Sequence, residues 1–102
     1  MASSPEAPAL AFLRGATVVY ELEDAETQIG RGEDNDIILT STRSVSSVHA
    51  RIVIDPERKR ARIVDLNSMN GTFVNDGRIQ DGACPLRSGD TVRFGYDKET
   101  YR

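Results

Sequence analysis

Short apolar segments recur along the chain from residue 10 onward, and turn-forming residues separate them. Within the segments, apolar and polar positions follow the two-residue period of β-strands, and no stretch carries a helical stripe of useful length. The pattern predicts strands over residues 11–13, 17–22, 27–29, 36–39, 48–54, 60–66, 72–74 and 91–94. Many short strands at close spacing in one small chain predict an all-β sandwich or barrel, with loops gathered at its ends.

Two of these segments form the clearest expected hairpin. Residues 49–54 and 60–66 lean toward alternation and are rich in β-branched side chains, which fit a pleated sheet. The polar stretch 55–59 between them predicts the connecting turn. Further turns are expected where Asn and Gly tolerate a positive φ, at Asn70-Gly71, Asn75-Asp76-Gly77 and Ser88-Gly89-Asp90.

The length of 102 residues suits one domain, which we place at residues 10–102. Residues 1–9 contain Ser-Ser-Pro and Ala-Pro steps without periodicity, so burial cannot offset the entropy of ordering them, and we expect a flexible lead. Hydrophobic residues make up 38% of the chain and charged residues 28%, which is a globular composition. No apolar run approaches the roughly 18 residues of a membrane-spanning helix, so we expect no membrane association.

The formal net charge of -3 predicts an electrostatic field that repels nucleic acid and anionic lipid. The basic run Arg58-Lys59-Arg60-x-Arg62 lies at the predicted hairpin turn, and we interpret it as solvated rather than as a nucleic-acid site. A single cysteine, Cys84, excludes an internal disulfide framework, and the N-terminus lacks the apolar core of a secretory signal. We therefore expect a reducing compartment, the cytoplasm or the nucleus. We also expect a monomer that holds no metal and no cofactor.

Small and polar residues occur at three breaks between the apolar segments: Gly30-Arg31, Ser46-x-x-His49 and Asn70-Gly71-Thr72. Their distribution predicts loops along one rim of a β scaffold. One arginine, one hydroxyl and one turn asparagine, if brought together, would suit a phosphate group and the peptide that carries it.

Five motifs follow one another along the chain: Ile29-Gly30-Arg31, Asn35-Asp36-Ile37, Ser46-Ser47-Val48-His49-Ala50, the run from Asp65 to Asn75, and Leu86-x-x-Gly89-Asp90-x-Val92-x-Phe94-Gly95. In this order and spacing they resemble the forkhead-associated (FHA) domain family, over about residues 29–95. The resemblance implies a two-sheet antiparallel β-sandwich of about eleven short strands. It also implies loops at one end that bind phosphothreonine-containing segments of partner proteins, with no catalysis.

The resemblance assigns the phosphate to two residues. Arg31 matches the family's phosphate-contacting arginine, and Ser46 matches the serine that donates its hydroxyl to a phosphate oxygen. A phosphate carries a charge of about -1.5 to -2 at neutral pH, and the positively charged guanidinium can bind it through two parallel N–H donors. The alternative for Arg31 is an ordinary surface ion pair with Glu33 or Asp34.

Other loop residues are expected to contact the peptide around the phosphate. Ser47 and Asn70 match positions that hold the peptide main chain, although Asn70 would also suit the left-handed residue of an Asn-Gly turn. Met69 departs from the small polar residue common in the family, and we expect it to reshape the pocket for the phosphothreonine methyl group. Ser44 stands where several relatives carry an arginine that reads the third residue after the phosphothreonine, so we expect weak or shape-based selection there. The neighbouring Arg43 has two interpretations. It contacts the phosphate or an acidic residue that flanks it, or it is a solvated loop residue.

Four residues are expected to support the site rather than to touch the ligand. Gly30 would let the chain bend so that Arg31 points out of the rim. His49 matches the family histidine that braces the binding loops from within, and Gly71 and Thr72 are expected to shape the turn.

Three other functions compete with this interpretation. Ser46 and His49 do not indicate a hydrolase, because no Gly-x-Ser-x-Gly turn precedes a helix and the chain has one histidine. No glycine-rich nucleotide-binding motif is present, since Gly30-Arg31-Gly32 does not fit one. The remaining competitor is a phosphate-independent module that binds a partner, or itself, through a sheet face or an edge strand.

Overall fold

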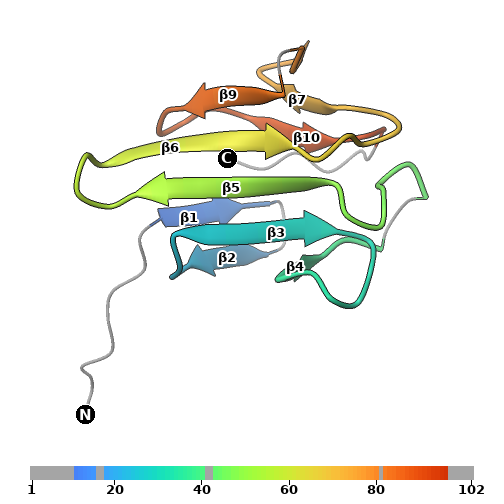
Figure 1. Ribbon diagram of the computed structural model, residues 1–102, viewed down its shortest axis with the longest axis horizontal. Coiled ribbons are helices and arrows are strands. Elements are labelled where there is room, and N and C mark those ends of the chain that lie inside the picture. The colour runs from blue at the N-terminus through green and yellow to red at the C-terminus, as the bar shows by residue number, and fades with distance from the viewer. Residues whose placement is uncertain (1–10, 16–17, 41–42, 81, 97–102) are drawn as a thin grey trace.

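The computed structural model describes residues 11–15, 18–40, 43–80 and 82–96, and this part of the chain contains strands and no helix (Figure 1). Its strands are β1 (Ala11–Arg14), β2 (Val19–Leu22), β3 (Glu26–Gly30), β4 (Ile37–Ile38), β5 (Ala50–Asp55), β6 (Arg60–Asp65), β7 (Thr72–Val74), β8 (Gly77–Arg78), β9 (Ala83–Leu86) and β10 (Val92–Phe94). The flexible lead predicted at residues 1–9 lies outside the described residues. Over the described ranges, no helix could span a membrane.

Three hydrogen-bonded sheets share one core. The largest has the order β4-β3-β5-β6-β9, and the others are β10-β7-β8 and β1-β2. All pairings are antiparallel except the short contact between β3 and β4, which is parallel. Buried side chains from all three sheets, among them Leu13, Ile29, Ile52, Ile63 and Phe94, form one apolar cluster. Sheets packed on a common core make a β-sandwich, so the predicted fold class is confirmed, with ten strands among the described residues.

β5 and β6 form the hairpin that the alternating pattern predicts. Each strand contributes six residues to the antiparallel pair. Ile52 pairs with Ile63 and both are buried, whereas Val53 pairs with Arg62 and both reach the solvent side of the sheet. The hydrophobic pattern therefore sets the register, because a shift by one residue would turn the isoleucines outward.

A second hairpin joins β7 to β8. Val74 pairs with Gly77, and the two residues between them, Asn75 and Asp76, have φ values of 50° and 69°. Two successive residues with positive φ are typical of a type I′ turn, which matches the right-handed twist of the strands. The turn predicted at this Asn-Asp-Gly sequence is therefore confirmed.

Three loops meet at one end of the five-stranded sheet, at the right of Figure 1. Residues 31–36 follow β3, residues 43–49 precede β5, and residues 66–71 follow β6. The register places the end of β3 beside the start of β5, and the start of β5 beside the end of β6. Antiparallel pairing alone therefore brings the three polar segments of the sequence to one rim.

Candidate functional site

Backbone hydrogen bonds join loop 31–36 to loop 43–49. The N–H of Arg31 donates to the carbonyl of Ser46 at 2.9 Å, and the N–H of Gly32 donates to the carbonyl of Ser47 at 3.0 Å. These bonds lie beyond the paired residues of β3 and β5 and join the loops directly. Arg31 and Ser46 are therefore hydrogen-bonded neighbours, although they are far apart in the sequence.

The side chain of Arg31 is exposed and anchored at one point. Its Nε–H donates to the carbonyl of Val45 at 3.1 Å, which uses one of the five N–H donors of the guanidinium. Among the described residues Arg31 forms no ion pair, so the predicted alternative of a bridge to Glu33 or Asp34 is not observed. The guanidinium lies at the carbonyl of Val45, the residue before Ser46, with no ion-pair partner among the described residues, which suits an incoming anion.

Residue 30 has to be a glycine because there is no room for a side chain at this position. A Cβ at this position would lie 2.3 Å from the carbonyl oxygen of Ser47 and 2.8 Å from Nδ2 of Asn35. The φ of Gly30 is not in the left-handed region, so the close approach of loop 43–49 explains this glycine better than a bend. Only a residue without a side chain lets the two loops come this near.

Ser46 is partly buried, and its hydroxyl already accepts one hydrogen bond. The N–H of Met69 donates to Oγ of Ser46 at 3.1 Å, which ties loop 66–71 to loop 43–49. The hydroxyl proton remains free to point toward an acceptor such as a phosphate oxygen. Ser47 is exposed and is held through its carbonyl, which also receives Nδ2–H of Asn35 at 2.7 Å.

His49 is fully buried and joins two loops from within. Its Nδ1 lies 3.0 Å from the N of Ser46, and its Nε2 lies 2.8 Å from the carbonyl oxygen of Gly71. A backbone N–H can only donate and a carbonyl can only accept, so the ring is neutral with its proton on Nε2. The ring edge packs on Phe94, with 5.7 Å between centroids.

Burial lowers the pKa of His49 below its ordinary value of 6.5, and neighbouring groups offset part of that effect. The hydrogen bond to Gly71 and the charge of Asp65 both act to raise this pKa. The net lowering agrees with the geometry, because a protonated Nδ1 would present a second donor to the N–H of Ser46. His49 therefore braces the loops in its neutral form, and both ring nitrogens are occupied.

Asp65 organises loop 66–71. Its carboxylate accepts hydrogen bonds from the hydroxyl and N–H of Ser68 and from the hydroxyl of Thr72, the last at 2.7 Å. Oγ of Ser68 in turn accepts the N–H of Gly71 at 3.0 Å. Burial raises the pKa of Asp65, but the hydrogen bonds from Ser68 and Thr72 outweigh it and hold that pKa below 3.8. The carboxylate therefore stays ionised as the anchor of the turn.

Asn70 does more than complete an Asn-Gly turn. The left-handed residue of this turn is Gly71, at φ 90°, and Asn70 is not among the residues with positive φ. Nδ2 of Asn70 donates to the carbonyl of Ser44 at 2.9 Å, and Oγ of Ser44 accepts the N–H of Tyr96 at 2.8 Å. The alternative of a purely conformational Asn70 is thus not supported, and Ser44 serves as a joint between the loops.

Two residues of the predicted peptide-contacting set stand open on the surface. Met69 has 84% of its surface exposed, and Arg43 is also exposed. Met69 adjoins Ser46 through its backbone N–H, whereas no hydrogen bond or ion pair among the described residues ties Arg43 to the other site residues. Met69 is therefore hydrogen-bonded to another predicted site residue, whereas Arg43 has no such bond among the described residues.

Sequence reasoning assigned no role to two residues on which the loops depend. Asn35 and Asp65 occur in the quoted motifs, but the sequence does not show which backbone groups they meet. Asp65 stands between the apolar residues Val64 and Leu66, which could have marked it as an internal anchor, whereas Asn35 stands between Asp34 and Asp36 and carries no such signal. No group of three His, Cys, Asp or Glu side chains in the described part of the chain is arranged to hold a metal ion.

Comparison with known proteins agrees with this geometry. The sequence model of the FHA domain family matches residues 27–95. The chain is 36% identical over 105 residues to the FHA domain-containing protein PS1 of Arabidopsis thaliana, across 98% of this chain but 6% of that protein. The chain thus spans a small part of this relative.

Solved structures give the same result. Mycobacterium tuberculosis EmbR in complex with a low-affinity phosphopeptide superposes with a TM-score of 0.77 at 37% identity, over 88% of this chain and 23% of that one. A structure from a structural and functional analysis of phosphothreonine-dependent FHA domain interactions superposes with a TM-score of 0.75 at 33% identity. The superposition covers 88% of this chain and 90% of that one. The chain belongs to the FHA domain family.

Proposed function

We propose that this domain binds phosphothreonine-containing segments of partner proteins and so mediates phosphorylation-dependent protein interaction. The observation that carries the proposal is the exposed guanidinium of Arg31, which has no ion-pair partner among the described residues and lies on a loop bonded to Ser46. Relatives support it, since the EmbR structure holds a phosphopeptide. Binding of this kind needs no cofactor.

Arg31 and Ser46 form the phosphate clamp in this proposal. The guanidinium supplies charge and parallel N–H donors, and the Ser46 hydroxyl supplies a short donor because its acceptor side already faces the N–H of Met69. The contact of Nε with Val45 restricts the Arg31 side chain before the ligand arrives. Preorganisation of this kind reduces the entropy lost on binding.

The remaining residues hold or frame the peptide. We assign Ser47 and Asn70 to the peptide main chain, Met69 to the wall beside the phosphothreonine, and Arg43 to the phosphate or an acidic flank. Gly30, His49, Gly71 and Thr72 keep the loops in register, and their contacts with the loops support that role.

Catalysis is not part of the proposal. The single histidine of the chain has both ring nitrogens on backbone groups, and Nδ1 faces the N–H of Ser46 rather than its hydroxyl. It cannot act as a general base toward Ser46 without giving up a loop contact. We also propose that the domain works in the cytoplasm or the nucleus, where a free cysteine such as Cys84 is ordinary.

A titration with degenerate peptide libraries tests the function. Three libraries are offered to the 102-residue chain, with phosphothreonine, phosphoserine or unmodified threonine at the fixed position. We expect retention of the phosphothreonine library and little retention of the unmodified one. Equal retention of the two would contradict the proposal and favour a phosphate-independent module that uses a sheet face or an edge strand.

A further inference from the structure

A single buried side chain fastens the two loops of the clamp to each other. Asn35 lies in loop 31–36 with 7% of its surface exposed, and its Nδ2 donates to the carbonyl of Gly32 at 2.8 Å and to that of Ser47 at 2.7 Å. Both acceptors are carbonyls, so the amide orientation is determined and both N–H donors are used. Gly32 follows Arg31, and Ser47 follows Ser46.

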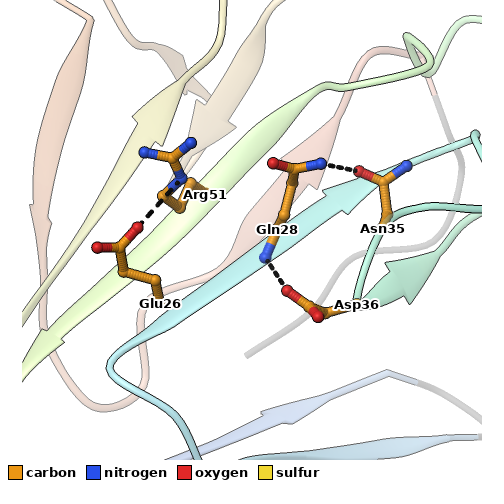
Figure 2. Close-up of polar contacts among 5 residues, drawn as sticks. All are labelled: Glu26, Gln28, Asn35, Asp36 and Arg51. Atoms are coloured by element: carbon orange, nitrogen blue, oxygen red, sulfur yellow. Dashed lines mark hydrogen bonds and ion pairs between the residues drawn. The ribbon is translucent and has the colours of Figure 1, made fainter.

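The other polar atom of this amide, Oδ1, is fixed by the sheet. Oδ1 of Asn35 accepts Nε2–H of Gln28 at 3.0 Å, as Figure 2 shows. Gln28 is held in turn by Asp36, whose carboxylate accepts the N–H of Gln28 at 2.8 Å and whose own N–H donates to the Gln28 carbonyl at 2.9 Å. The orientation of Asn35 is therefore imposed from strand β3, which is part of the rigid scaffold.

The packing around Asn35 leaves little freedom for either loop. Its Nδ2 lies 2.8 Å from the place where a Cβ on residue 30 would stand, which is closer than two such atoms can approach. Apart from those of Asn35, the hydrogen bonds described between the two loops are the two backbone bonds from Arg31 and Gly32 and the bond from the Arg31 side chain to Val45. Removing the amide would leave Arg31 on a loop with fewer restraints, and the ligand would then have to order that loop on binding.

We propose that Asn35 is a positioning residue of the phosphate clamp: it sets the spacing of Arg31 and Ser46, and Gln28 sets its orientation. The inference rests on the proposed phosphothreonine binding. Asn35 does not touch the ligand in this scheme, and its effect passes through Arg31. A residue that only stabilised the fold would change the melting temperature without interacting energetically with Arg31.

A double-mutant cycle separates these roles. The probe is one phosphothreonine peptide selected from the degenerate library, and its affinity for the folded protein is measured by calorimetry well below the melting temperature. We expect Asn35→Ala to weaken binding by about tenfold, the equivalent of roughly one hydrogen bond of positioning. In an Arg31→Lys background, we expect Asn35→Ala to cost less than about twofold, because a flexible lysine does not depend on where a planar fork is held.

Two further variants complete the experiment. Gln28→Ala leaves Asn35 in place but frees its amide, and we expect a loss of about threefold in affinity. Glu26→Gln is the matched control on the same strand and face, since Glu26 pairs with Arg51 at 3.5 Å and does not contact Asn35 (Figure 2). We expect no change in affinity for this control.

The outcomes are distinct. If the phosphorylated and unmodified peptides bind alike, the proposed function has failed. If binding depends on phosphate but the costs of Asn35→Ala and Arg31→Lys add, Asn35 is structural only and the positioning role is overturned. Calorimetric stoichiometry reports the folded fraction of each variant. Should Asn35→Ala fail to fold, Gln28→Ala decides, and affinity equal to the parent would overturn the inference.

Discussion

Nδ1 of His49 accepts the backbone N–H of Ser46 at 3.0 Å, so a buried imidazole holds the residue that the proposed clamp uses for phosphate. The same ring reaches the carbonyl of Gly71 on its other side, 2.8 Å from Nε2. Only the neutral ring satisfies both contacts. The loop end of this domain therefore depends on the protonation state of one side chain.

We predict that stability falls below neutral pH because of His49. The unfolded chain takes up a proton on His49 near pH 6.5, whereas burial lowers the pKa of the folded ring, so between the two values the unfolded state binds more protons. The free energy of unfolding should fall as pH drops below 6.5, by at most about 1.4 kcal/mol per pH unit. Urea unfolding at a series of pH values checks this.

His49→Gln provides the control for that experiment. The variant has no histidine, so the decline just below pH 6.5 should disappear. Nuclear magnetic resonance of the parent follows one imidazole without ambiguity. A folded-state pKa at or above 6.5 would contradict the assignment of a neutral brace.

We predict that Gly30→Ala pushes loop 31–36 away from loop 43–49 and so separates Arg31 from Ser46. The added Cβ would lie 2.3 Å from a backbone oxygen of Ser47, which cannot move aside as a flexible side chain could. Phosphothreonine peptide affinity should fall at least tenfold, and stability should fall by about 1 to 3 kcal/mol. Calorimetry and thermal unfolding measure the two effects.

Gly77→Ala is the matched control for Gly30→Ala. A Cβ there would meet its nearest atom, the Val74 carbonyl oxygen, at 3.4 Å, and Gly77 has no left-handed φ. This substitution should leave affinity unchanged. Equal behaviour of the two alanine variants would show that the close approach at Gly30 does not matter.

We predict that Asp65→Asn loosens loop 66–71. The amide oxygen can still accept the hydroxyls of Ser68 and Thr72, but the amide NH2 then faces the backbone N–H of Ser68, which loses its acceptor, at a cost of about 1 to 3 kcal/mol in unfolding free energy. Hydrogen bonds hold the folded pKa of Asp65 below 3.8, so the carboxylate's advantage exists above that pH and is lost as pH falls through the folded value. Urea unfolding of parent and variant at pH 7 and below 3.8 tests this. Equal stability at pH 7 would refute the anchoring role.

The pattern of apolar and polar residues predicts most of the strands but not the edge strands β8 and β9. β5 and β6 are recognisable because both are rich in β-branched residues, and the buried positions of β5 alternate with half-buried ones. β8 and β9 are not, since β8 has two residues and β9 contains Pro85, which an edge strand tolerates because one side of its ladder is unpaired. The parallel contact of β3 with β4 also has no local signal.

The candidate site is predictable from the sequence only as a set of residue types. Arg31, Ser46 and Asn70 could be singled out from motif resemblance and loop chemistry. The partners of Asn35 could not, because they are the carbonyls of Gly32 and Ser47, and every residue carries a carbonyl. From the sequence, Gly30 suggests a bend in the chain. In the structure it is the point where the backbone of β3 comes close to the backbone of Ser47. Such roles arise from tertiary contact.

We predict weak selection for acidic residues at the third position after the phosphothreonine. Ser44 is bonded through Oγ to the N–H of Tyr96 and through its carbonyl to Asn70, so it braces the loops and offers no charge. Any preference from exposed Arg43 should stay below about fivefold, as expected for a solvated ion pair. An oriented phosphopeptide library with a sharp Asp or Glu preference there would overturn this prediction.

The most direct measurement is a calorimetric titration of one phosphothreonine peptide into the parent chain and into Arg31→Ala. Removing one member of a charged, hydrogen-bonded pair costs about 2 to 5 kcal/mol, which corresponds to a loss of roughly thirty-fold to several thousand-fold in affinity. We expect a loss in that range, with a melting temperature close to that of the parent because the Arg31 side chain is exposed. A change in affinity of less than threefold, with the variant folded, would contradict the account.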